Sequence, residues 1–137
     1  MKRLAPPPAP NFATLGTRQL HALADLLRED VADAVEQCIA FIEADTLGNW
    51  HNRARAMMSR RLKHCSLTAG QRDRLVQAIV QRLVSGRFAQ QFKDQLRLAL
   101  QLDATRVHAV ARSCAGAQAE HTRRYAAWVL SRELAHG

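Results

Sequence analysis

Residues that favour β-strands are scarce in this sequence. Aromatic side chains make up 5% of the 137 residues, and β-branched residues are also few. Alanine, leucine, arginine and glutamine dominate instead, and these residues favour α-helices. No segment alternates polar and apolar residues as a strand does. The composition therefore predicts an all-α fold, in a chain long enough to bury one continuous core.

Cysteine and long apolar segments are also in short supply. The three cysteines are Cys38, Cys65 and Cys114, and none forms a CxxC pair, which argues against a disulfide framework and for a reducing compartment. No stretch approaches the roughly 20 apolar residues that cross a bilayer. The basic first residues are not followed by the apolar segment of a secretory signal. We therefore expect a cytoplasmic protein with no membrane partner.

Recognisable catalytic and metal-binding motifs are missing. Six histidines accompany the cysteines, but they do not form the close pairs that structural zinc sites use. There is no GxSxG motif and no glycine-rich phosphate loop. Basic residues beside Cys65 would lower the pKa of its thiol, although a buried structural cysteine is the commoner case. We expect no metal, cofactor or catalytic residue, and an enzyme with a dispersed site ranks third among the functions that the sequence allows.

Proline is confined to residues 6–10, within a Pro-rich tail over residues 1–11 that we expect to be disordered. Residues 12–137 are expected to form a single all-α domain. Charge divides this domain into an acidic N-terminal helical unit over residues 12–48 and a basic helical part over residues 49–137. Apolar periodicity predicts six or seven helices joined by short turns.

The acidic unit contains the clearest helical periodicity. Apolar residues from Leu20 to Ile42 recur at spacings of three and four, which places them on one stripe. The unit is therefore either one long helix or two helices separated near Asp30, which would then be an N-cap. Gly48 is expected to end the unit, and Asn49 to cap the next helix.

Capping signals divide the basic part of the chain. Thr68 and Gln71 have the spacing of a capping box, so a helix should start at residue 69. Gly86 is expected to end that helix, and Asp103 to cap a shorter helix further on. The expected core includes both tryptophans, Trp50 and Trp128.

Residues 120–130 read EHTRRYAAWVL. An arginine followed by paired alanines and then leucine resembles the first helix of a HEAT-type repeat, and residues 53–58 echo it loosely. The resemblance implies a short HEAT-like stack of helical hairpins, a fold that binds partners along a concave face. Residues 92–100 lack the arginine, and the usual repeat proline is absent. A compact helical bundle explains the same periodicity, so both architectures remain open.

Charges of the two signs are unevenly placed along the chain. Residues 1–48 carry four basic and seven acidic side chains, whereas residues 49–137 carry sixteen basic and five acidic ones. The net charge of +8 and this asymmetry indicate contact with a polyanion or an acidic surface. Seventeen of the 20 basic residues are arginine, a bias that GC-rich codons also produce.

The densest basic segment, residues 49–87, contains a single acidic residue, and we predict that its basic side chains bind the partner. They are Arg53, Arg55, Arg60, Arg61, Lys63, Arg72, Arg74, Arg82 and Arg87. Acidic side chains of the first unit share a stripe opposite the apolar one. This stripe is either solvated or a docking face for the basic part of a second copy. Its residues are Asp25, Glu29, Asp33 and Glu36.

The sequence thus favours a non-enzymatic protein-interaction module that recognises an acidic protein through a basic helical surface. The alternative is sequence-nonspecific nucleic-acid binding through the same residues, with the steep salt dependence of counterion release. Against this alternative, no helix-turn-helix, zinc-finger or RNP motif occurs, and aromatic side chains for base stacking are few.

Overall fold

The computed structural model of the protein describes residues 15–44, 46, 48–88 and 91–136, with side chains up to Arg132. Over these residues the protein consists of helices joined by links. The helices are α1 (Thr17–Leu26), the 3₁₀ turn η2 (Leu27–Glu29), α2 (Ala32–Glu43), α3 (Asn49–Leu62), α4 (Ala69–Ser85), α5 (Phe92–Ser113) and α6 (Glu120–His136). No strand occurs among these residues, so the all-α prediction is confirmed. The predicted tail over residues 1–11 lies outside the described residues.

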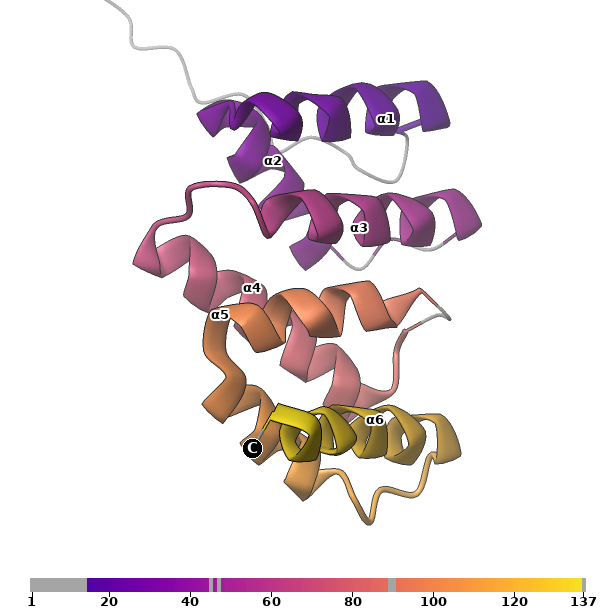
Figure 1. Ribbon diagram of the computed structural model, residues 1–137. Helices are drawn as coiled ribbons and strands as arrows, with labels where there is room; N and C mark the ends of the chain where they lie inside the picture. The colour runs from indigo at the N-terminus through magenta and orange to yellow at the C-terminus, as the bar shows by residue number, and fades with distance from the viewer. Residues whose placement is uncertain (1–14, 45, 47, 89–90, 137) are drawn as a thin grey trace, which may run out of the picture.

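The helices form two layers (Figure 1). The front layer contains α1, α3, the first half of α5 and α6, which lie side by side and run in the same direction. Along this layer α1 contacts α3, α3 contacts α5, and α5 contacts α6. Behind it, α2 and α4 contact each other and return the chain. The architecture is a compact all-α bundle, and membership of the HEAT class stays a prediction.

The core lies between the two layers and is built from the predicted apolar stripes. In the acidic unit Leu20, Val35 and Ile42 are at most 2% exposed. Leu75 and Ile79 of α4 are completely buried in the same core cluster. The helical periodicity of the sequence therefore identified the inward face of both segments.

Three predicted helix boundaries are confirmed. Thr68 Oγ1 accepts the N–H of Gln71 at 3.1 Å, and the Gln71 side chain accepts the N–H of Thr68 at 3.0 Å, which completes the capping box. Gly86 ends α4 in the left-handed conformation, with φ of 74°. Asp103 has non-helical dihedrals within α5, and its carboxylate accepts the N–H of Arg106 at 3.2 Å. Asp103 thus caps the second half of α5, where the helix changes direction.

Two details of the acidic unit differ from the prediction. The stripe is interrupted near Asp30, so one long helix is wrong, but Val31 is the N-cap of α2. Asp30 adopts φ of 52°, and both of its carboxylate oxygens accept the N–H of Ser66 at 3.1 Å. Its carboxylate therefore binds the segment that follows α3 and does not cap α2. Similarly, Gly48 and not Asn49 occupies the N-cap of α3.

Candidate anion-binding face

One of the predicted partner-binding residues is buried. Arg55 is 3% exposed, and its guanidinium donates hydrogen bonds to the carbonyl oxygens of Ala44 at 2.9 Å and Thr46 at 2.7 Å. It also lies over the ring of Phe41, 5.0 Å from the centroid. Because these contacts hold the link between α2 and α3, Arg55 belongs to the scaffold and not to a binding surface.

Two arginines of α4 are also engaged with backbone carbonyls. Arg82 donates to the carbonyl oxygen of Ala44 at 3.0 Å and to the side-chain oxygen of Gln95 at 3.2 Å. Arg72 is exposed and donates to the carbonyl oxygen of Leu102 at 3.4 Å. Arg82 therefore joins α4 to two other segments of the fold, as Arg55 does for α3.

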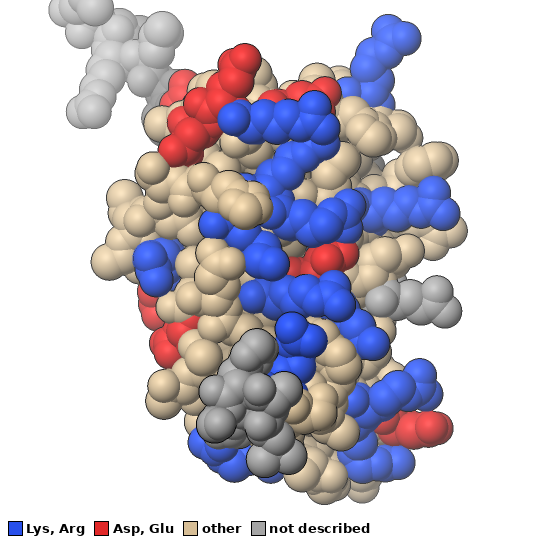
Figure 2. Space-filling view, viewed as in Figure 1, with Lys and Arg blue, Asp and Glu red and all other residues tan. Residues whose placement is uncertain are grey.

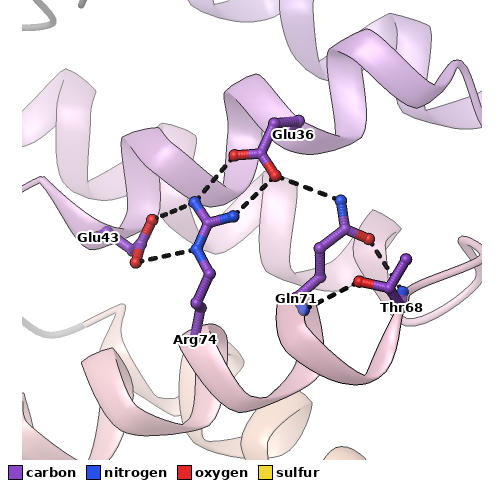
Figure 3. Close-up of polar contacts among 5 residues, drawn as sticks. All are labelled: Glu36, Glu43, Thr68, Gln71 and Arg74. Atoms are coloured by element: carbon purple, nitrogen blue, oxygen red, sulfur yellow. Dashed lines mark hydrogen bonds and ion pairs between the residues drawn. The ribbon is translucent and has the colours of Figure 1, made fainter.

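Two more predicted residues pair with the acidic unit of the same chain. Arg74 reaches from α4 to two carboxylates of α2, Glu36 at 2.8 Å and Glu43 at 2.6 Å (Figure 3). The hydrogen bond from Arg74 lowers the pKa of Glu36, and the pKa of Arg74 is raised in turn. Arg61 pairs with Asp25 at 3.0 Å. Part of the charge asymmetry is thus neutralised within the chain.

The acidic stripe faces solvent, as the sequence predicts. Asp25, Glu29, Asp33 and Glu36 are all exposed. Two of these four carboxylates, Asp25 and Glu36, already pair with arginines of the same molecule. Docking of a second copy on this stripe stays a prediction, and it would have to compete with these pairs.

The remaining predicted residues reach the surface at separate places. Lys63 is half-buried at the end of α3, where its carbonyl oxygen accepts a hydrogen bond from Gln101, and Arg87 follows α4. Arg53 and Arg60 are both exposed on α3. The two positions are seven apart in sequence, which is about two turns, so these two side chains share one side of the helix.

Trp50 lies beside Arg53 and is exposed, so the expectation that it belongs to the core is wrong. The side chain of Trp50 is 55% exposed, and the Arg53 guanidinium lies 5.2 Å from the ring centroid. Trp50 occupies the first turn of α3, where side chains lean toward the helix N-terminus and no preceding turn covers them. An exposed tryptophan paired with an arginine is a feature that helical periodicity did not predict.

Three cations surround the second tryptophan. Lys93 and Arg97 of α5 each lie 5.4 Å from the centroid of Trp128, and Arg132 of α6 lies 5.2 Å from it. These three cations lie outside the dense segment 49–87, so they were not among the predicted partner-binding residues. The only local signal is the spacing of Trp128 and Arg132, which places them on one face of a helix.

Asp94 links the two groups of cations. Its carboxylate accepts from Arg60 at 2.7 Å and from Arg97 at 3.3 Å, which joins α3 to α5. We define the basic face as Arg53, Arg60, Lys93, Arg97 and Arg132. Figure 2 shows lysine and arginine side chains gathered in a band over the front layer, with few acidic ones between them. The structure thus brings together two predicted residues and three others.

A hollow of about 310 Å³ opens at one end of this face. It lies between α1, α3 and the start of α5, and its apolar lining includes Leu20, Ala54 and Met57. Two cations of the basic face, Arg53 and Arg60, also line it. The described lining residues are Thr17, Leu20, His21, Trp50, Arg53, Ala54, Ala56, Met57, Arg60 and Gln91. They include one imidazole, that of His21, and one hydroxyl, that of Thr17, but no carboxylate, cysteine or serine.

The cysteines do not have the reactive surroundings that the basic neighbours of Cys65 suggest. Burial, the charge of Asp30 and a hydrogen bond with Asp30 all raise the pKa of the Cys65 thiol. Burial raises the pKa of Cys38 to about 12. Of the two alternatives for Cys65, the surroundings therefore favour a buried cysteine, because desolvation and a carboxylate outweigh the nearby cations.

The described residues contain neither a cluster of metal ligands nor a helix that could span a membrane. No three histidine, cysteine, aspartate or glutamate side chains converge there as metal ligands. None of the described helices combines the length and the apolar composition needed to cross a bilayer.

Comparisons of this chain with protein-family models, curated proteins and solved structures find no match. The basic face and the hollow beside it are therefore the features that bear on its function.

Proposed function

We propose that this chain is a non-enzymatic interaction module that binds an acidic protein through the basic face. The observation that carries the proposal is the imbalance of charge on that face. Of its five cations, Arg60 and Arg97 pair with Asp94, whereas Arg53, Lys93 and Arg132 pair with no acidic side chain among the described residues. Carboxylates of a partner would supply the missing negative charge and guide its approach.

The way in which the cations of the basic face are held in place also favours binding. Its cations project from packed helices of the front layer, and four of the five lie over a tryptophan ring. Cation–π contacts of this kind restrict the side chains before the partner arrives, which reduces the entropy lost on binding.

Charge reversal on the face tests the proposal. A labelled poly-glutamate peptide serves as the acidic probe, and its fluorescence anisotropy reports binding. We expect Arg53→Glu and Lys93→Glu each to weaken binding by about tenfold, since each replaces an attraction to the probe by a repulsion. Raising the salt concentration should weaken binding to the unsubstituted chain.

Arg72→Glu is the matched control. It makes the same change in net charge at an exposed arginine of α4, which lies outside the basic face. Equal losses in all three variants would show that net charge alone attracts the probe, and that the basic face is not the binding site. Circular dichroism checks that each variant keeps its helices.

Nucleic acid is the second candidate, and the exposed ring of Trp50 is the observation that favours it. Base stacking on an aromatic ring beside an arginine is a common mode of single-strand binding. The test is a labelled oligothymidylate titrated against salt, with heparin as competitor. Binding tighter than that of poly-glutamate, and lost in a Trp50→Ala variant, would replace the acidic-protein proposal.

A further inference from the structure

We propose that the hollow beside Trp50 accepts one large apolar side chain of an acidic peptide segment, so that the partner is anchored there and its carboxylates lie on the basic face. This inference rests on the proposed function and specifies the partner. It assigns separate roles to the apolar lining of the hollow and to the cations at its edge.

The floor of the hollow is suited to an aliphatic or aromatic side chain. Leu20 and Ala54 are at most 3% exposed, and Met57, which is partly buried, packs against the same core. Their side chains leave a depression because alanine at position 54 is short, and methionine adapts to differently shaped occupants. Filling such a depression removes apolar surface from water on both partners.

The edge of the hollow is suited to acidic residues on either side of that anchor. Arg53 and Arg60 both line it and lie about 10 Å apart along α3 at the helical rise per residue. An extended peptide rises about 3.3 Å per residue, so about three residues span the two cations. The expected motif is therefore a bulky apolar residue between two carboxylates that are about three residues apart.

The same floor argues against a nucleotide base as the occupant. The side chains of Leu20, Ala54 and Met57 carry no hydrogen-bond donor or strong acceptor. A base on this floor would depend on Thr17, His21 and Gln91 at the edge of the hollow for its hydrogen bonds, and any polar atom that they left unpaired would cost free energy, whereas an apolar side chain needs no such partners. The observations therefore favour a peptide over a single-stranded nucleic acid.

The decisive measurement compares two labelled peptides by fluorescence anisotropy. One is a glutamate-rich peptide with a single central phenylalanine, and the other has alanine in its place. We expect the phenylalanine peptide to bind the unsubstituted chain about tenfold tighter, because burial of the ring adds to the charge attraction that both peptides share. The ratio of the two affinities is the quantity tested.

Substitutions in the hollow should bring this ratio of affinities close to one, while the charge attraction that both peptides share remains. Trp50→Ala and Met57→Ala are expected to bring the two peptides to similar affinity. Val84→Ala is the matched control, since Val84 is an apolar residue of α4 that is 59% exposed and does not line the hollow. It should leave the ratio unchanged, and circular dichroism confirms the fold of each variant.

Other results separate this inference from the proposed function. Equal binding of the two peptides to the unsubstituted chain would overturn the anchor while leaving the acidic-partner proposal in place. Binding of neither peptide would overturn both. Displacement of the phenylalanine peptide by a lower concentration of oligothymidylate would assign the hollow to nucleic acid instead.

Discussion

Arg53 and Arg55 are two positions apart on α3 and have opposite surroundings. Arg53 is exposed beside Trp50, whereas Arg55 is 3% exposed and donates hydrogen bonds to carbonyl oxygens of the link between α2 and α3. Two nearby arginines of one basic segment thus have different roles, since Arg53 belongs to the basic face and Arg55 to the scaffold. The sequence alone could not tell which of the two is exposed, because both are arginines in the same basic segment.

The two arginines should therefore differ in their effect on stability. We expect Arg55→Leu to lower the free energy of unfolding by roughly 1–3 kcal/mol, because the carbonyl oxygen of Thr46 loses the guanidinium donor and that of Ala44 keeps only the one from Arg82. Arg53→Leu should change it by less than about 0.5 kcal/mol, as is usual for an exposed side chain. Urea denaturation measures both. Equal losses in the two variants would contradict the assignment of Arg55 to the scaffold.

At the scale of elements, the ends of the helices position the front layer. The link that follows α4 packs on α6, where a ring nitrogen of His121 lies 2.7 Å from the carbonyl oxygen of Gly86. The ring of Phe88 in the same link stacks on that of Phe92, with 4.4 Å between the ring centroids. It meets the ring of Tyr125 edge-on, with 4.8 Å between the centroids. The turn at Gly86 therefore determines how α5 and α6, which carry three cations of the basic face, approach each other.

Two glycines of the same helix should respond oppositely to alanine. Gly86→Ala combines a left-handed φ of 74° with a Cβ only 2.9 Å from His121 Nε2, so we expect a loss of about 1–3 kcal/mol in the free energy of unfolding. Gly70 lies in the first turn of α4, where the nearest atom to an added Cβ is 4.0 Å away. Gly70→Ala should stabilise the protein by about 0.5 kcal/mol. Thermal and urea denaturation report both, and a neutral Gly86→Ala would contradict the tight turn.

At the scale of the whole molecule, the acidic unit and the basic part are folded against each other. Arg74 bridges Glu36 and Glu43, and the Gln71 side chain adds a hydrogen bond to Glu36 at 3.3 Å. These contacts lie between the two halves that differ in charge. These ion pairs compensate part of the asymmetry locally, and the chain as a whole keeps its net charge of +8.

This contact between the halves should weaken in acid. The pKa of Glu36 is lowered in the folded state from its ordinary value of 4.5, so its contribution to stability is complete above that value and is lost as the pH falls through the lower, folded pKa. At neutral pH we expect Glu36→Gln to cost up to about 1 kcal/mol, since the pair is largely exposed. The difference from the unsubstituted protein should shrink in urea denaturation below about pH 4.

Glu29→Gln provides the control for this measurement. It removes the same charge from an exposed carboxylate of the acidic stripe that has no ion pair among the described residues. It should change stability little at neutral pH. A Glu29→Gln loss as large as that of Glu36→Gln would show that overall charge, and not the bridge to Arg74, stabilises the contact.

Local properties of the chain were enough to predict the helices, their buried stripes and most of their boundaries. Periodicity and caps such as Thr68 with Gln71 depend on residues within one or two turns, so they can be read from sequence. The basic face depends on contacts between distant segments, such as Arg60 with Asp94 and Lys93 with Trp128. Whether an arginine is paired, buried or available is decided by which helices pack beside it, because ion pairs and burial form only when the helices meet.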